Sequence, residues 1–165
     1  MKRVVLLLSF VVCCVMSVFA KSDVTLKSGS LSKLKTSKAK VYVVWDYSHA
    51  TLEGQDVKTF LKEKGKEWER DYKAELEHAE ANFMERFNDK TKSVTLTDKK
   101  SEADYTIVIE VKDFHYGSTG ASVLIGFGAG DAHMSGLMNF YEKNVKQPFA
   151  VIDVDGVAGA GYGNE

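Results

Sequence analysis

A long run of helical periodicity between residues 57 and 87 restricts the fold of this chain more than any other feature. Apolar side chains recur there at steps of three, four or seven positions: Val57, Phe60, Leu61, Trp68, Tyr72, Leu76, Ala79, Phe83 and Phe87. This spacing places them in one stripe along a helix, and such a stripe must pack against another part of the protein. Gly65 interrupts the stripe and costs about 1 kcal/mol relative to alanine inside a helix. We therefore expect a short helix near 54–62, which Ser48 or Thr51 would cap, and a long helix near 65–88.

Segments with strand character lie on both sides of this helical region. Residues 41–45 are apolar at every position, which is typical of a central strand covered on both faces. Period-two alternation follows the helix, in residues 94–96, 104–112, 134–140 and 149–154. We interpret the last three as successive antiparallel strands beneath the long helix. The sequence thus predicts a single α+β domain over 41–158, with an antiparallel or mixed sheet of about five strands and the long helix, preceded by the short one, on one face.

The first twenty residues have the pattern of an export signal. Lys2 and Arg3 precede an almost unbroken apolar run, and Val18-Phe19-Ala20 suits a signal peptidase. We expect cleavage after Ala20 and a location in the periplasm, in the cell envelope or outside the cell. A retained membrane anchor and a lipid anchor on Cys13 or Cys14 are the alternatives, although the apolar run is short for a span of about twenty residues.

Cleavage would also change the composition of the chain. It removes Lys2 and Arg3 but no acidic residue, so the net charge of −1 becomes −3. This mild acidity argues against a nucleic-acid partner. Because Cys13 and Cys14 both lie inside the signal, the mature chain has no disulfide, no thiolate nucleophile and no cysteine-rich zinc site. The sequence has no Asn-x-Ser/Thr sequon, which favours a bacterial envelope protein over a glycosylated secreted one.

Two flanking segments differ in composition from the predicted domain. Residues 21–40 contain six lysines, five serines and one aspartate. We interpret this segment as a solvated lead-in that pins a few side chains to the domain. The alternative is a patch that contacts an anionic membrane surface, which would be worth about 1 kcal/mol for each lysine. Residues 159–165 form a glycine-rich tail.

Two Asp-x-His pairs form a candidate metal site. Asp113 and His115 are two residues apart, as are Asp131 and His133, so each pair would share one face of a strand. A hairpin centred near residue 123 would place His115 opposite about residue 131, close to His133. Carboxylate and imidazole groups in such a cluster suit zinc or another divalent ion. A one-residue slip in register would separate them, and the alternative is that they are ordinary polar residues near a loop.

Other motifs point away from catalysis. The glycine run at 126–130 leads into an alternating strand rather than a helix N-terminus, so we expect bends or bulges there and no nucleotide. No Gly-x-Ser-x-Gly elbow is present. The sequence predicts no cofactor.

We expect a non-enzymatic binding or interaction domain whose partner is an envelope protein or glycan. The alternative is a metal-binding protein or metal-dependent enzyme that uses the Asp/His cluster.

Four short motifs resemble a family of exported α+β proteins of Bacteroidetes-type bacteria whose function is unknown. They are residues 27–35 (KSGSLSKLK), 44–48 (VWDYS), 52–54 (LEG) with Phe60-Leu61, and 103–107 (ADYTI) before a glycine-rich stretch. The likeness covers most of residues 24–158. It implies an envelope location and a compact α+β domain, and it assigns no catalytic residue.

The resemblance is incomplete at the C-terminus. Members of that family continue from the last strand into a loop and a C-terminal helix, whereas this sequence reads AGAGYGNE over residues 158–165. From this difference we expect a sheet face that lacks its cover, with Met134, Met138 or the row that contains Ile107 exposed.

Overall fold

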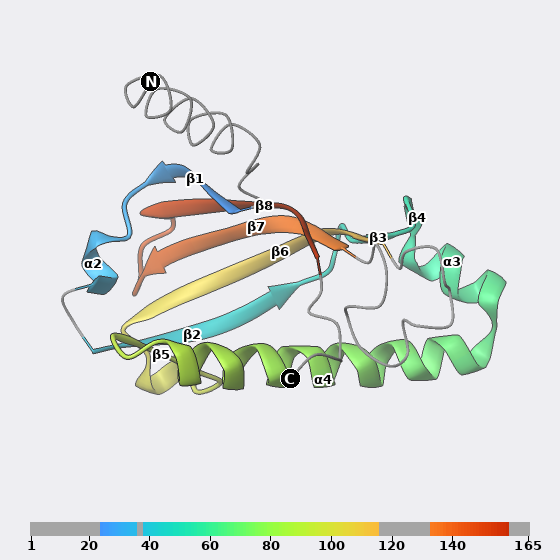
Figure 1. Cartoon of the computed structure of the whole chain (residues 1–165), viewed down its shortest axis with the longest axis horizontal. Coiled ribbons are helices and arrows are strands. Elements are labelled where there is room, and N and C mark those ends of the chain that lie inside the picture. Colours follow the sequence, from blue (N-terminus) through green and yellow to red (C-terminus); the bar gives the residue numbers. More distant parts are fainter. Residues whose placement is uncertain (1–23, 36–37, 116–132, 159–165) are drawn as a thin grey trace, which may run out of the picture.

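The computed structural model describes residues 24–35, 38–115 and 133–158, which form a mixed eight-stranded sheet with helices beside it (Figure 1). The strands of the main sheet run in the order β1 (Val24–Gly29), β8 (Ala150–Ala158), β7 (His133–Glu142), β6 (Tyr105–His115), β2 (Ala39–Asp46) and β5 (Val94–Thr97). The short strands β3 (Thr51–Leu52) and β4 (Gln55–Asp56) form a hairpin, and β3 pairs with the end of β6. The α+β class is confirmed, but the sheet has more strands than the five expected.

The predicted antiparallel succession is present. β6 pairs with β7 and β7 with β8, both antiparallel, whereas β2 runs parallel to β6 and β5. The parallel pairs arise because the chain crosses over through helices between β2 and β5.

The helical region divides at Gly65, as its sequence predicts. Helix α3 (Val57–Lys64) ends there and helix α4 (Lys66–Lys90) follows. Gly65 has φ 99°, which favours glycine, and its N–H donates to the Leu61 carbonyl at 2.9 Å. The cap of α3 is Asp56, whose carboxylate accepts from the Thr59 N–H at 3.0 Å, so the expectation of Ser48 or Thr51 is wrong.

Helix α4 packs against one face of the sheet. Phe83 meets Trp45 of β2 edge to face, with ring centroids 5.3 Å apart. Ile107 and Ile109 of β6 are buried in the core on this side. Of the residues expected to lie exposed, the Ile107 row is therefore covered, while Met134 and Met138 of β7 are half-buried.

Strand β2 lies between β6 and β5, as expected of a central strand, but only one of its two faces is buried. Val41 and Val43 are buried, whereas Tyr42 and Val44 on the other face are half-buried. The expectation that both faces are covered is wrong, because α4 packs on the side of Val41 and Val43 and no described helix packs on the other.

The lysine-rich segment before β2 is partly structured. Val24–Gly29 forms β1, which pairs antiparallel with β8, and the short helix α2 (Ser32–Lys35) buries Leu34. The burial of Leu34 agrees with a lead-in that pins side chains to the domain. The lead-in also supplies a strand and a short helix, so the sheet begins before residue 41 and the predicted domain boundary has to be corrected. Lys33 pairs with Glu142 of β7, and membrane contact by these lysines stays a prediction.

Within the described ranges, no helix has both the length and the apolar character needed to cross a membrane. The export signal at 1–20, the glycine run at 126–130 and the tail at 159–165 lie outside the described residues, so what the sequence predicts for them stays a prediction.

Candidate functional site

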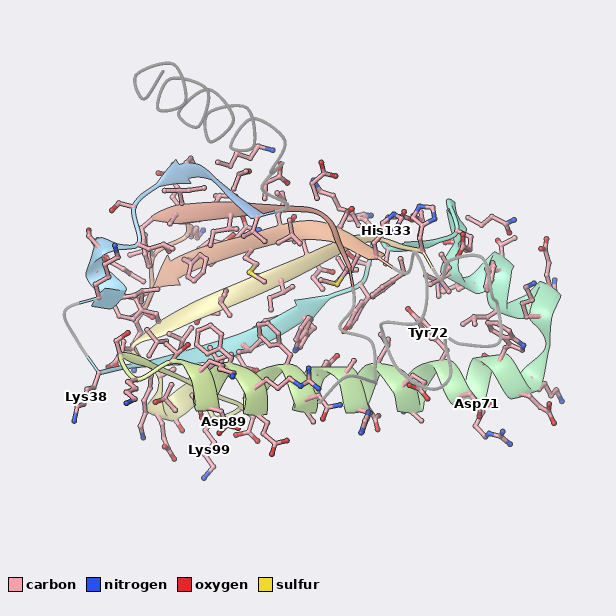
Figure 2. All side chains as sticks on the ribbon, in the orientation of Figure 1. Lys38, Asp71, Tyr72, Asp89, Lys99 and His133 are labelled. Atoms are coloured by element: carbon pink, nitrogen blue, oxygen red, sulfur yellow. The ribbon has the colours of Figure 1, made fainter. Side chains whose placement is uncertain are left out.

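The structure brings three of the four predicted metal-site residues together at one end of the sheet. His115 ends β6 and pairs in register with His133, which begins β7. Their rings stack with centroids 4.4 Å apart and an angle of 24° between planes. Figure 2 labels His133 beside the β3 hairpin, at the opposite end of the sheet from Lys38 and Lys99. Asp131 lies outside the described residues.

Both ring nitrogens of His115 contact carboxylates. Nε2 lies 2.5 Å from Oδ2 of Asp113, and Nδ1 lies 3.2 Å from Oε2 of Glu53. Glu53 occupies the turn between β3 and β4 with φ 51°, and its N–H donates to the Phe114 carbonyl at 2.9 Å. The Thr51 hydroxyl contacts the Asp113 carboxylate on its other side. The β3–β4 hairpin therefore fixes the carboxylates around His115.

This arrangement is that of a hydrogen-bonded polar cluster. A carboxylate lies close to each of the two ring nitrogens of His115. Stacked rings also direct their nitrogens along nearly parallel planes rather than toward one point. No set of three or more His, Cys, Asp or Glu residues in the described part of the chain is arranged to hold a metal ion.

A second candidate is the sheet face that points away from α4, which we call the open face. Its members alternate with the buried positions of β2, β6, β7 and β8, and all are half-buried except the buried Asn139: Tyr42, Val44, Thr106, Val108, Glu110, Leu137, Asn139, Tyr141, Val151 and Asp153. Val44, Val108, Asn139 and Val151 lie in one row across four strands. Asn139 donates to Oε1 of Glu110 at 2.9 Å, which satisfies the buried amide. No helix of the described ranges packs over this face.

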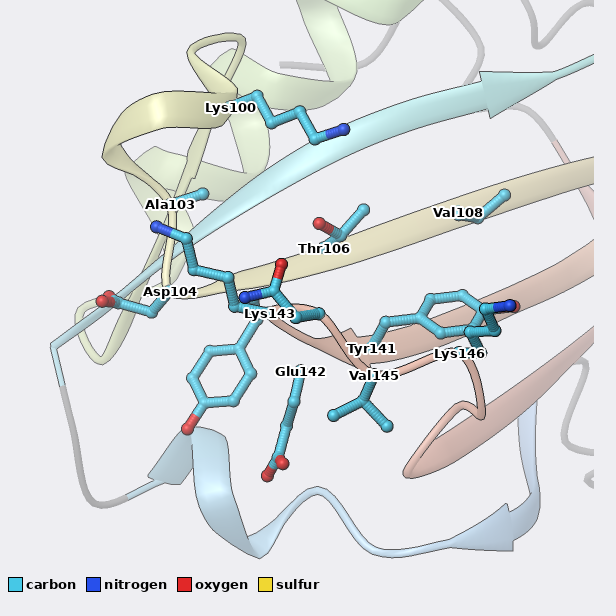
Figure 3. A pocket seen from close by; sticks show the side chains of 12 residues that line it. Lys100, Ala103, Asp104, Thr106, Val108, Tyr141, Glu142, Lys143, Val145 and Lys146 are labelled. Atoms are coloured by element: carbon cyan, nitrogen blue, oxygen red, sulfur yellow. The ribbon is translucent and has the colours of Figure 1, made fainter.

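The open face leads into a hollow beside the turn that joins β7 to β8. The hollow has a volume of about 470 Å³, and Thr106, Val108 and Tyr141 of the open face line it. Lys100, Lys143 and Lys146 stand around it (Figure 3). Its volume is in the range of small-molecule sites.

Charge is unequally distributed along the open face. The end near His115 carries Asp46, Glu110 and Asp153, which lie in one row of paired residues with Leu137. Hydrogen bonds from Ser48 hold the pKa of Asp46 below its usual value, so this carboxylate stays ionised. The other end carries the lysines of the hollow. A bound partner would therefore experience a basic and an acidic end.

Comparisons with known proteins returned no match, either among protein-family models, among curated proteins or among solved structures.

The sequence pattern identified part of this site. The Asp-x-His spacing indicated Asp113, His115 and His133, and the strands place these three together. It missed Glu53, although the Glu53-Gly54 pair before the helical region is a turn signal. It also missed the hollow, because Lys143 and Lys146 approach Lys100 through strand pairing between segments some forty residues apart in the chain.

Proposed function

We propose that this protein is an exported bacterial envelope protein that acts as a non-enzymatic binding domain and holds an envelope partner on its open face. Both a protein and a glycan were expected from the sequence. The hollow favours a glycan, because it is of a size for small ligands and combines an aromatic ring, hydroxyl and amide groups with cations. This hollow in an otherwise half-exposed sheet face is the observation that carries the proposal.

The position of the hollow suits a binding role. The open face offers Val44, Val108 and Val151 as apolar contact area, and polar groups surround them. Binding surfaces commonly combine an apolar centre with a polar rim. The export signal expected at residues 1–20 would deliver this surface to the envelope, where glycans are abundant.

Sedimentation with isolated cell envelopes tests the proposal. The exported protein is mixed with envelopes that are untreated, digested with protease, or oxidised with periodate to destroy sugars. We expect saturable binding that survives protease and is lost after periodate. Binding lost after protease instead would identify a protein partner. No saturable binding, or specific turnover in an activity screen, would contradict the proposal.

A matched pair of variants locates the surface. Val44→Lys places a charge in the apolar row of the open face, and we expect it to weaken envelope binding about tenfold or more. Glu77→Lys introduces the same side chain on the outer side of α4, with a charge change of +2 rather than +1, at a position where the side chain is 72% exposed, and this variant should bind as the natural protein does. Thermal unfolding of both variants verifies that they fold.

A second candidate is a metal-binding protein or metal-dependent enzyme built on Asp113, His115, Asp131 and His133. The pairing of His115 with His133 beside Asp113 is the observation that favours it. The two carboxylates already in contact with His115 favour the binding domain instead, because a metal would have to displace one of them from a ring nitrogen.

A further inference from the structure

The hollow is built by ordered backbone on its outer side. Residues 142–145 form a turn in which the Val145 N–H donates to the Glu142 carbonyl at 3.1 Å, with Asn144 at φ 66°. Asparagine tolerates this left-handed conformation better than most residues do. The Phe149 N–H then returns to the Phe140 carbonyl at 2.8 Å. The turn therefore holds Lys143 and Lys146 at defined places on the rim.

The three rim lysines lack the acidic partners that neighbouring lysines have. Lys33 pairs with Glu142, and Lys40 pairs with Glu102 at 2.9 Å. In contrast, Lys100, Lys143 and Lys146 make no ion pair with any described residue. The hollow thus gathers three lysines that form no ion pair in the part of the chain that the structure describes.

The acidic residues of the lining cancel only part of this charge. Glu142 is paired with Lys33, whereas Asp104 accepts the neutral backbone N–H of Lys40 at 2.9 Å and keeps its negative charge. Three lysines against one remaining carboxylate leave the lining with a net charge of about +2. Ammonium groups in a concave site attract anions, and hydrogen bonds between ammonium and carboxylate or phosphate oxygens are among the stronger ones in proteins.

The rest of the lining suits a ring that carries hydroxyl groups. Tyr141 supplies an aromatic surface, Val145 an apolar one that is 46% exposed, and Thr106 a hydroxyl. In Figure 3, Lys100 lies above Thr106, Lys143 to its left, and Tyr141 and Lys146 to its right, so the three lysines stand at separate places around the hollow. A ligand with an anionic group and a less polar ring face would satisfy both kinds of contact.

We propose that this hollow binds an acidic saccharide unit, whose carboxylate or phosphate group is attracted by the positive charge of Lys100, Lys143 and Lys146 around the rim and whose ring lies against Tyr141. The inference rests on the proposed function and adds to it the chemical class of the ligand. The anionic group makes the hollow prefer acidic sugars to neutral ones. The contacts with the sugar ring make it bind a saccharide more tightly than an inorganic anion.

Titration of the full exported chain followed by amide NMR tests this inference. The probes are D-glucuronate, glucose 6-phosphate, neutral glucose and inorganic phosphate. We expect saturable shifts at the amides of residues 141–146 with at least one acidic sugar, and affinity about tenfold lower for glucose and for phosphate. Binding should weaken as ionic strength rises, since salt screens exposed charges.

Two double variants serve as test and control. Lys143→Ala with Lys146→Ala should weaken acidic-sugar binding about tenfold or more, because it removes two of the three cations. Lys66→Ala with Lys73→Ala removes the same charge from α4 and should leave the binding unchanged. Both pairs lie at exposed positions, and circular dichroism verifies that the variants fold.

Four results would overturn the inference, each in a distinct way. Equal binding of glucose would remove the anionic requirement, and equal binding of inorganic phosphate would remove the saccharide. Lysine-dependent binding to phosphatidylglycerol vesicles with no binding of the sugars would assign the hollow to a lipid headgroup. No binding of any sugar, while envelopes still bind through the open face, would refute the ligand of the hollow and leave the proposed function intact.

Discussion

Tyr47 connects the sheet to α4 through both its ring and its hydroxyl. The ring stacks on Trp45 and on Phe114, with centroids 6.3 Å away in each case. The hydroxyl donates to Oε1 of Glu80 on α4 at 2.9 Å. Burial and the neighbouring Glu80 carboxylate raise the pKa of Tyr47 far above its usual value. The side chain therefore stays neutral in the folded protein well into the alkaline range.

The variant Tyr47→Phe tests this bond and its pH dependence. At neutral pH we expect a loss of about 1 kcal/mol in the free energy of unfolding. An unfolded tyrosine ionises near pH 10, whereas the folded one keeps its proton, so rising pH favours unfolding of the natural protein above that value. The stability difference between the two proteins should be complete below about pH 10 and shrink above it. Urea denaturation at several pH values measures this, and a difference that stays constant to pH 11 would contradict it.

His115 and His133 give a second prediction at this scale, on metal content. Because carboxylates contact both nitrogens of His115, we expect added zinc to be washed out by desalting, with far less than one equivalent retained per chain. Elemental analysis of untagged protein provides the measurement. One retained equivalent, lost in His133→Ala, would instead establish the metal-binding candidate.

Among the elements, β1 depends on close backbone contact at its end. Gly29 has φ 77°, and a Cβ atom there would lie 2.0 Å from the carbonyl oxygen of Phe149. Gly54, in the β3–β4 turn, has a similar φ of 73° but open space around it. The two glycines therefore separate the cost of backbone conformation from the cost of a clash.

We expect Gly29→Ala to destabilise the protein more than Gly54→Ala. Each substitution forces an L-residue into the left-handed region, at roughly 1–2 kcal/mol, and Gly29→Ala adds a clash with backbone that costs about 1–3 kcal/mol more. Chemical denaturation of both variants measures the difference. Equal losses of stability in the two variants would contradict this prediction, because they would show that β1 moves away from Phe149 and relieves the clash at no cost in free energy.

The elements differ in how well their sequences predict them. The break at Gly65 and the strand at Tyr105–His115 follow from strong local patterns: a glycine in a helical stripe and a long alternation of apolar residues. Strand β1 lacks such a pattern because all of its residues are exposed at the sheet edge, so its Val24 and Leu26 looked like isolated apolar residues. The two-residue strands β3 and β4 are too short to show any period.

For the whole molecule, export is the prediction that bears most on function. We expect the mature chain to begin at Lys21, because Val18-Phe19-Ala20 offers a signal-peptidase site. Mass spectrometry of protein recovered from the periplasm or medium measures the new N-terminus. An intact Met1, or a lipid on Cys13 or Cys14, would contradict this prediction and indicate that the protein is anchored to the membrane.

Local sequence sufficed for helices α3 and α4, the long strands, the α+β class and the Asp-x-His pairs, because each depends on the spacing of residues close together in the chain. The number of strands, the uncovered face and the hollow depend on contacts between distant segments. Lys100 meets Lys143 because β6 pairs with β7, and Glu53 meets His115 because β3 pairs with β6. Pairing of this kind depends on the packing free energy of the complete sheet, which no single segment contains.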